Sequence, residues 1–260
     1  MPTLRLQLAY DGGPFRGWAA QPGVRTIEGE LTTALETVLR HQVDLSVAGR
    51  TDAGVHAWAQ VASCDVEGEP PGDLARRLNG LLPGEITIHS VERAADGFDA
   101  RRDALSRVYC YRVLAGSVPS PFERSRSLHW PYPLDRALLE ECASLLPGTH
   151  DFTAFTPTET QHVRFERDVL HAGWRQVAAP VPGELLEFWI EADAFMRNMV
   201  RVLVGTILEV ATARRTLADL ERLLNGAARE EAGETAAAHG LYLAGVRYES
   251  QPAGTPGEQD

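Results

Sequence analysis

Lysine is absent from this chain of 260 residues, so its 25 fixed positive charges are all arginines. The planar guanidinium of arginine donates paired hydrogen bonds to phosphate or carboxylate oxygens, which a lysine ammonium cannot do. A source genome that favours arginine codons explains the same absence. The 36 acidic residues give a net charge of −11, opposite to the balance typical of non-specific RNA-binding proteins.

The excess of acid is not spread evenly along the chain. Residues 1–112 contain 12 Arg against 15 Asp and Glu, so most of the excess lies further on. We therefore expect a local basic cleft on an acidic body. A negative surface potential around Asp52 would contradict this expectation.

Cysteine is scarce as well. Cys64, Cys110 and Cys142 are odd in number and lack Cys-x-x-Cys spacing, which argues against a disulfide framework or a zinc site and fits a reducing cytoplasm.

The chain also lacks a phosphate-binding glycine loop and a metal-ligand cluster, so we expect no cofactor. Its longest apolar run, residues 202–208, is too short to span a bilayer, and no signal peptide is recognisable near Met1.

Hydrophobic periodicity predicts an α+β protein with a largely antiparallel central sheet, because strands and helices follow one another in mixed order. Apolar alternation and β-branched runs predict strands over residues 4–10, 43–47, 58–66, 86–91, 106–112, 164–177 and 185–192. Helical spacing and capping residues predict helices over residues 26–40, 135–145, 195–211 and 216–224, with a shorter one from Asp73. Residues 227–238 are low in complexity and are expected to be exposed.

The segment 48–57, which follows the predicted strand 43–47, carries the strongest candidate for chemistry. Gly49 and Gly54 surround Arg50 and Asp52, whose side chains share a face if the chain is extended. An arginine beside a carboxylate keeps it ionised and aimed, and a held carboxylate at a strand end is a candidate nucleophile or base. A structural ion pair in a tight turn explains the same residues, and the pattern alone leaves both interpretations open.

The string GRTDAGVH at residues 49–56 resembles the signature of the TruA-type tRNA pseudouridine synthases. The resemblance implies that Asp52 is the catalytic nucleophile of an isomerase that converts uridine to pseudouridine in the anticodon stem-loop of tRNAs, at positions 38 to 40. It covers nearly the whole chain to Tyr248 and includes Tyr10-Asp11-Gly12, although Ala19 replaces an expected glutamine. His56 in this string is interpreted as a hydrogen-bonded structural residue rather than an acid–base group.

The predicted strand 106–112 contains the pattern Arg-x-Tyr-x-Tyr, which is similar to a family motif. The resemblance implies that Tyr109 packs against the target base and that Arg101 contacts phosphate. Stacking of bases on tyrosine fits RNA recognition in general. The alternatives are a half-buried strand tyrosine and a solvated arginine.

Two further site residues are implied by family motifs. Arg201 lies among apolar residues of the predicted helix 195–211, where a buried arginine needs an anionic partner, and the resemblance implies that it pairs with Asp52. The alternative is that its long side chain reaches solvent. Leu243, at the end of Gly-Leu-Tyr-Leu, is implied to line the uridine pocket and is equally compatible with a core strand.

The implied architecture is the pseudouridine synthase fold, in which two similar halves share a largely antiparallel central sheet flanked by helices. Residues 1–112 are expected to form the first half, 113–248 the second, and 249–260 a disordered tail. The resemblance also implies a homodimer in which one tRNA contacts both subunits. Two other classes stay open: a carboxylate-dependent nucleoside or glycoside hydrolase, which needs a second positioned acid, and a catalytically silent RNA-binding protein.

Overall fold

The computed structural model describes residues 1–159 and 163–249, and these form two compact units. The first unit contains residues 1–107 together with 242–249, and the second contains residues 108–241. Residues 242–249 therefore group with the first unit although they are far from it in sequence. Residues 250–260 of the expected tail lie outside the described residues.

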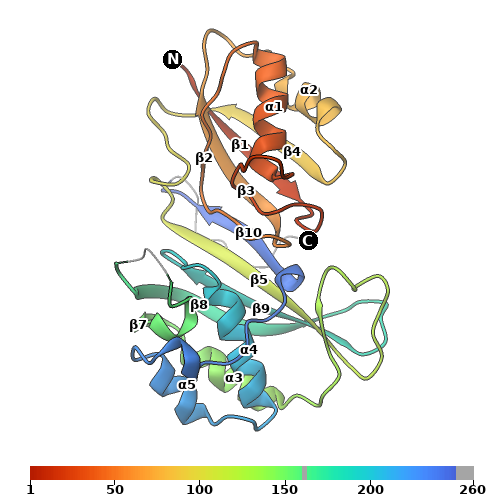
Figure 1. Ribbon diagram of the computed structural model, residues 1–260, viewed down its shortest axis with the longest axis vertical. Helices are drawn as coiled ribbons and strands as arrows, with labels where there is room; N and C mark the ends of the chain where they lie inside the picture. The colour runs from red at the N-terminus through yellow and green to blue at the C-terminus, as the bar shows by residue number, and fades with distance from the viewer. Residues whose placement is uncertain (160–162, 250–260) are drawn as a thin grey trace. The chain divides into compact units, whose positions relative to one another are not determined.

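A sheet with the strand order β4-β1-β3-β10 forms the first unit (Figure 1). Strand β1 (Thr3–Tyr10) pairs antiparallel with β3 (His56–Asp65) on one side and with β4 (Ile86–Arg93) on the other. Strand β10 (Leu241–Arg247) pairs parallel with β3, and the short β2 (Ser46–Val47) pairs antiparallel with it. This pairing places β10 beside the strand that follows segment 48–55.

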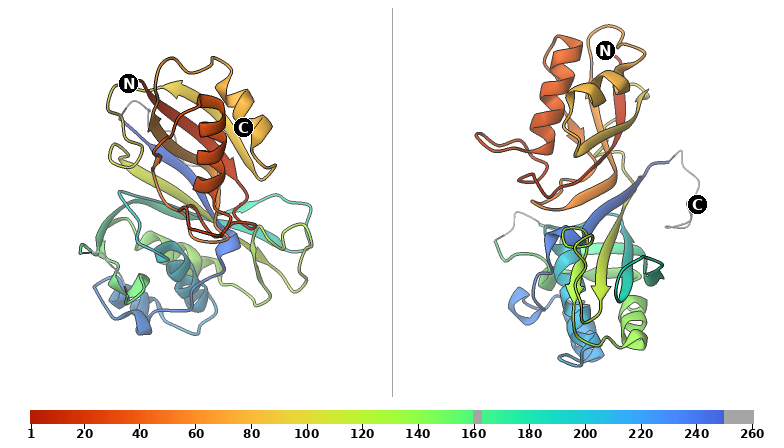
Figure 2. Two further views of the ribbon diagram at one scale, coloured as in Figure 1. Left: turned by 45° about the horizontal axis from the view of Figure 1, so that its top comes forward. Right: turned by 90° about the vertical axis from the view of Figure 1, so that its right-hand side faces the viewer.

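Two helices, α1 (Ile27–Leu39) and α2 (Leu74–Leu81), complete the first unit. Helix α1 begins where the side chain of Thr26 accepts a hydrogen bond from the amide of Gly29, as the sequence predicts for an N-cap. Its buried stripe includes Ile27, Leu31 and Leu35. Figure 2 shows α1 alongside the strands of this unit from two further directions.

The second unit contains a sheet with the order β5-β9-β8-β7, in which β6 pairs with β5. Its strands are β5 (Ser106–Ala115), β6 (Leu128–Trp130), β7 (Gly148–Asp151), β8 (Glu166–Val177) and β9 (Glu184–Ala192). The pairs β7–β8 and β8–β9 are antiparallel, whereas β6 runs parallel to β5. The mostly antiparallel sheets and accompanying helices confirm the predicted α+β class.

Three helices, α3 (Arg136–Ser144), α4 (Met199–Ala211) and α5 (Leu217–Leu223), pack on one another in the second unit (Figure 1). Helix α4 is buried along most of its length. Short 3-10 turns form at Thr153–Phe155, Arg229–Glu231 and Ala238–Gly240. Within residues 1–159 and 163–249, no helix has the length and apolar character needed to cross a membrane.

Three local predictions are wrong. The strand predicted over residues 43–47 is reduced to Ser46–Val47. The helix predicted from residue 195 begins only at Met199, because Asn198 adopts a left-handed φ of 62° that interrupts a helix. Residues 227–238 are not uniformly exposed, since Ala232 and Gly233 are buried and Gly233 packs against α4.

Two helical glycines give a test of this packing. A Cβ at Gly205 in α4 would lie 1.9 Å from the carbonyl oxygen of Glu234, whereas one at Gly80 in α2 meets nothing within 4 Å. We expect Gly205→Ala to lower the free energy of unfolding by about 2 kcal/mol or more through overpacking. Gly80→Ala should raise it by about 0.5–1 kcal/mol through helix propensity. Urea unfolding followed by circular dichroism measures both, and equal midpoints for the two variants would contradict the packing.

Candidate active site

The segment 48–55, here called the aspartate loop, connects β2 to β3 in the first unit. Asp52 is half-buried on this loop, Arg50 is exposed, and Thr51 between them is buried. The carbonyl oxygen of Asp52 accepts a hydrogen bond from the amide of Val55 at 3.1 Å, which closes a turn. The loop therefore presents Asp52 next to a residue that is anchored in the core.

Thr51 is that anchor. Its hydroxyl lies 2.8 Å from the hydroxyl of Tyr10, and its carbonyl oxygen accepts a hydrogen bond from the amide of Trp18 at 3.0 Å. The side-chain amide of Gln60 donates both to the Tyr10 hydroxyl at 3.1 Å and to the carbonyl oxygen of Gly49 at 2.8 Å. The backbone on the N-terminal side of Asp52 is thus held by three elements of the first unit.

The 11–18 segment packs directly on the aspartate loop, and its glycines permit this. A Cβ at Gly12 would lie 1.9 Å from the carbonyl oxygen of Val55. Gly17 has a φ of +95°, which strains any other residue, and a Cβ there would make a tight contact of 3.0 Å with the carbonyl oxygen of Thr51. The glycines of this segment therefore serve close backbone approach within the protein.

His56 joins the same two segments. Its Nδ1 accepts a hydrogen bond from the amide of Gly12 at 3.1 Å, so the neutral ring carries its proton on Nε2. A carboxylate oxygen of Asp11 also lies 3.1 Å from Nδ1, but this contact is attractive only for a protonated ring, and the same oxygen already accepts from Gly13. Because the ring is buried and stacks on Tyr242 at 4.7 Å, we assign it the neutral, structural role.

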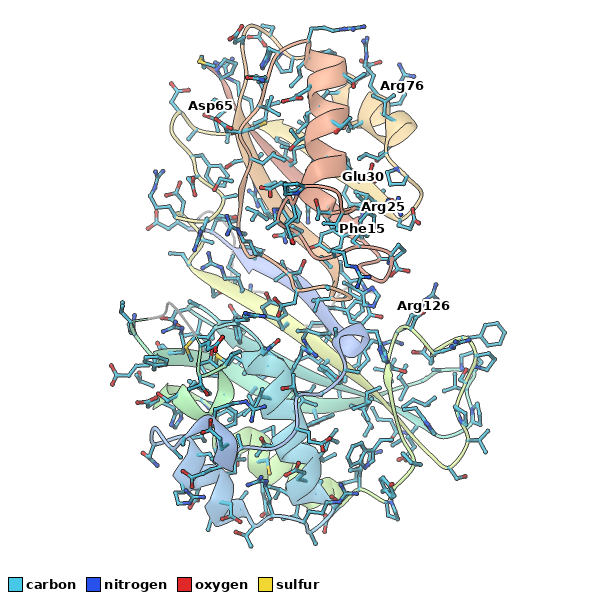
Figure 3. The ribbon with its side chains drawn as sticks, viewed as in Figure 1. Phe15, Arg25, Glu30, Asp65, Arg76 and Arg126 are labelled. Atoms are coloured by element: carbon cyan, nitrogen blue, oxygen red, sulfur yellow. The ribbon has the colours of Figure 1, made fainter. Side chains whose placement is uncertain are left out.

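Arg25 fastens the other end of the 11–18 segment. Its guanidinium lies 4.4 Å from the centre of the buried Phe15 ring and forms ion pairs with Glu30 at 2.8 Å and Glu85 at 3.4 Å. Figure 3 shows Arg25 between Phe15 and Glu30 at the end of α1. Because its guanidinium already contacts Phe15, Glu30 and Glu85, Arg25 is not a candidate for binding phosphate.

Arg107 has a role that the sequence pattern did not reveal. Its Nε and Nη2 donate to the carbonyl oxygen of Ala48 at 3.0 and 2.9 Å, and it also donates to the carbonyl oxygens of Ala104 and Arg101. It therefore fixes the start of the aspartate loop. Alternation along the strand could assign Arg107 to a face, but the carbonyl groups that it meets are set by the tertiary fold.

The expectation that Arg50 holds Asp52 by an ion pair is wrong. Among the residues that the structure describes, the Asp52 carboxylate forms neither an ion pair nor a hydrogen bond, and Arg50 has no carboxylate partner. The interpretation of these two residues as a structural ion pair in a turn fails for the same reason. The loop therefore presents an uncommitted carboxylate whose position is set by neighbouring residues.

The other predicted site residues are divided between the two units. Leu243 is fully buried in the first unit, in register with Ala57 on β3, and Arg101 is exposed there. In the second unit, the buried Tyr109 ring meets Phe195 edge-on at 4.9 Å.

Arg201, also in the second unit, donates to the carbonyl oxygen of Ala236 at 2.7 Å and to the side chain of Asn198 at 3.0 Å. Its predicted pairing with Asp52 would join residues of different units. That pairing stays a prediction, as does the contact of Tyr109 with a base.

Burial changes the titration of the aspartate-loop anchor. It raises the pKa of the Tyr10 hydroxyl from 10.0 to about 12, although the hydrogen bonds with Thr51 and Gln60 act in the opposite direction. Tyr10 is therefore a neutral hydrogen-bonding group at physiological pH. No cluster of three His, Cys, Asp or Glu side chains within residues 1–159 and 163–249 could hold a metal ion.

Comparison with known proteins identifies the class. A family model described as tRNA pseudouridine synthase matches residues 142–249. A tRNA pseudouridine synthase A of Frankia casuarinae is 44% identical, with 96% of this chain and 90% of that protein covered. Those of Corynebacterium glutamicum and Bacillus licheniformis are 40% and 37% identical over 95% of this chain, and 89% and 99% of the relatives are covered.

A chain this similar over nearly its full length is a pseudouridine synthase, and thus an isomerase. In particular, it belongs to the tRNA pseudouridine synthase A family.

Substitution of Tyr10 by Phe tests the anchor of the aspartate loop. At neutral pH we expect Tyr10→Phe to lower the free energy of unfolding by about 1–3 kcal/mol, because Thr51 and Gln60 lose a buried hydrogen-bond partner. The raised pKa means that the folded state resists ionisation of Tyr10, so the wild type loses stability as the pH rises from 10 towards 12. The Tyr10→Phe variant should lose less stability between pH 10 and 12, because it has no hydroxyl to ionise.

Urea unfolding of both proteins between pH 9 and about 12 measures this difference, which should reach roughly 2–3 kcal/mol. Other buried groups that titrate in this range contribute to both proteins and cancel in the comparison. Parallel curves for the two proteins would show that Tyr10 is not held neutral by the fold.

Proposed function

We propose that this protein isomerises uridine to pseudouridine at positions 38 to 40 in the anticodon stem-loop of tRNAs, with Asp52 as the nucleophile. The observation that carries the proposal is an uncommitted, half-buried carboxylate on a loop that is anchored before it by Thr51 and after it by His56. Membership of the tRNA pseudouridine synthase A family supports the reaction and the tRNA substrate. The anticodon position follows from the resemblance of the motif at residues 49–56.

The reaction breaks the N1–C1′ bond of uridine, turns the uracil, and joins C5 to C1′. Atoms and electrons balance within the nucleoside, since the hydrogen on C5 leaves as a proton and N1 gains one. The target must first leave its stack, at a cost of a few kcal/mol. The Asp52 carboxylate would attack either the sugar or the base, and a nucleophile held in place loses little entropy in doing so.

The remaining site residues take supporting roles in the proposal. Arg50 and Arg101 are exposed arginines of the first unit and would hold RNA phosphates and the extruded nucleotide. Tyr109 would pack on the target base, and Leu243 would line its pocket. Arg201 would orient the Asp52 carboxylate.

We further propose that the protein acts in the cytoplasm as a homodimer in which one tRNA contacts both subunits. Three buried, unpaired cysteines fit a reducing compartment. A basic cleft around Asp52 on an acidic body would favour productive over non-specific RNA contacts.

Asp52→Asn tests the nucleophile. The amide is nearly isosteric but not nucleophilic, so isomerisation should fall by at least about 10⁴-fold, on the scale of losing a covalent catalyst. Release of tritium from uridine labelled at C5 measures the rate, and carbodiimide mapping locates the product.

Asp44→Asn is the matched control, since Asp44 is an exposed carboxylate of the same unit outside the aspartate loop. It should retain wild-type activity. Near wild-type turnover by Asp52→Asn would refute the nucleophile assignment.

The products distinguish the other two classes. Free uracil or cleaved sugar released by the wild-type protein would indicate a hydrolase, and binding of transcripts without any pseudouridine would indicate a silent RNA-binding protein. Either result would overturn the proposed reaction.

Substrate position is tested with unmodified tRNA transcripts. We expect carbodiimide-detectable pseudouridine at 38, 39 or 40 wherever uridine stands there, since the base pocket is proposed to take nucleotides of that region only. Transcripts with cytidine at all three positions are the control and should remain unmodified. Modification of that control elsewhere would contradict the anticodon assignment while leaving the isomerase class intact.

A further inference from the structure

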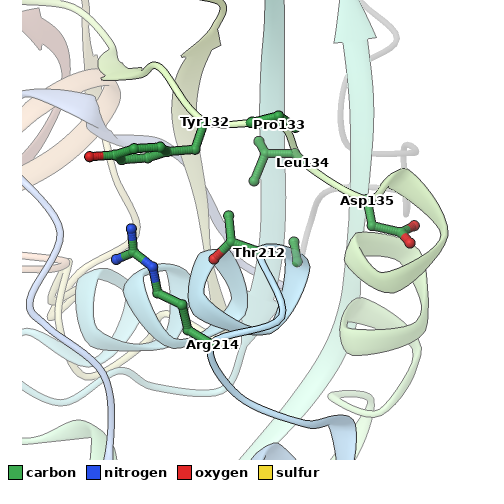
Figure 4. A pocket seen from close by; sticks show the side chains of 7 residues that line it. Tyr132, Pro133, Leu134, Asp135, Thr212 and Arg214 are labelled. Atoms are coloured by element: carbon green, nitrogen blue, oxygen red, sulfur yellow. The ribbon is translucent and has the colours of Figure 1, made fainter.

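A cavity of about 590 Å³ in the second unit lies outside the residues assigned to catalysis. It opens between the segment that follows β6 and the C-terminal end of α4, as Figure 4 shows. It is lined by Tyr132, Pro133, Leu134, Asp135, Ala211, Thr212 and Arg214. The cavity combines an aromatic ring, a hydroxyl and a cation on elements that are fixed by the backbone.

The C-terminal end of α4 holds Arg214 in a defined direction. Ala213 adopts a left-handed φ of 57°. The amide of Ala213 donates to the carbonyl oxygen of Val210 at 2.9 Å, and the amide of Arg214 donates to the carbonyl oxygen of Glu209 at 2.9 Å. These are the two hydrogen bonds of a Schellman motif, in which glycine is the preferred left-handed residue. Alanine occupies that position here at a conformational cost.

The opposite wall is tied to the same helix end. The amide of Asp135 donates to the carbonyl oxygen of Ala211 at 3.0 Å. The carboxylate of Asp135 accepts from the amides of Ala137 and Leu138 at the start of α3, and in Figure 4 it points away from Arg214. This acidic residue therefore lines the cavity without neutralising the cation in it.

Arg214 lies beside two aromatic rings and, like Arg124 and Arg197 of the same unit, forms no ion pair among the described residues. Its guanidinium lies 5.2 Å from the ring centre of Tyr132 and 5.9 Å from that of Trp130. Six other arginines of the unit form ion pairs, namely Arg112, Arg136, Arg164, Arg175, Arg215 and Arg222. In a strongly acidic chain, an exposed arginine kept free of carboxylates and aligned by aromatic rings is available to an anion.

Tyr132 supplies a platform beside that cation. Its side chain is 52% exposed although it is large and aromatic, and its ring meets Trp130 edge-on at 5.6 Å, which holds it in one orientation. A base stacks on any exposed aromatic face, and an arginine at the edge of the stack reaches the adjoining phosphate. A planar group linked to a phosphate matches both walls of the cavity.

We infer that this cavity is a second RNA-binding site, at which a nucleotide of the substrate tRNA other than the target stacks on Tyr132 and bonds through its phosphate to Arg214. This inference rests on the proposed tRNA substrate. Arg201, proposed to act on Asp52, lies ten residues before Ala211 on α4, a rise of about 15 Å. This distance along α4 is longer than a single nucleotide, so the second site would bind a part of the RNA other than the target nucleotide.

Affinity for full-length tRNA tests the site. Arg214→Gln and Tyr132→Ala should each raise the Kd and the KM roughly fivefold or more and leave kcat at saturation unchanged, because the contact is made equally in the ground and transition states. Arg214→Gln should also lower the slope of log Kd against log salt by about one phosphate contact. Arg214→Lys should retain that slope and recover part of the affinity.

Arg222→Gln is the matched control, because Arg222 is an exposed arginine of the same unit already engaged by Glu231. An equal loss in Arg222→Gln would overturn the site in favour of general electrostatics. The second RNA-binding site would also be refuted if Arg214→Gln bound tRNA with the Kd and the salt slope of the wild type. It would likewise be refuted if the variant changed self-association without changing tRNA affinity, since the surface would then contact a second copy of the chain.

These outcomes are separable from failure of the proposed function. All variants are compared with a wild-type protein first shown to isomerise tRNA, and circular dichroism melting confirms that each variant is folded. If the wild type fails to isomerise, the proposed function falls. If it isomerises and Arg214→Gln binds tRNA like the wild type, only the second site falls.

Discussion

The close approach of two backbone segments in the first unit is the constraint on which the site depends. The 11–18 segment lies so near the aspartate loop that a single methyl group at Gly12 would collide with the carbonyl oxygen of Val55. The amide of Trp18 then reaches the carbonyl oxygen of Thr51, and His56 accepts from the amide of Gly12. These contacts fix the main chain on both sides of Asp52.

This arrangement separates the task of holding Asp52 from the task of reacting. Here Thr51, Tyr10, Gln60 and Arg107 restrain the main chain and leave the reactive oxygens unengaged among the described residues. The ordering is completed during folding, so substrate binding does not have to supply it.

Periodicity was sufficient to predict the α+β class and most elements, because β1 alternates clearly, β9 is a short apolar run after a Pro-Gly turn, and α1 carries a capped apolar stripe. The motif at residues 49–56 located the candidate nucleophile. Three features could not be predicted from the sequence and were seen only in the structure. They are the hydrogen bonds from Arg107 to the carbonyl oxygen of Ala48, the Schellman motif at Ala213, and the absence of an Arg50–Asp52 ion pair. Each depends on contacts across the tertiary fold or on an alanine where glycine would be expected, and local patterns carry neither kind of information.

The pairing of β10 with β3 has a consequence for how the protein is made. Tyr242 lies in register with His56, although almost the whole second unit separates them along the chain. On a ribosome that adds about 5–20 residues per second, the N-terminal part must wait on the order of ten seconds or more for its last strand. During that interval the edge of β3 and the ring of His56 lack the partners they have in the finished protein. Nascent chains paused before residue 242 should therefore carry an incomplete first unit, dependent on chaperones in a way that the released protein is not.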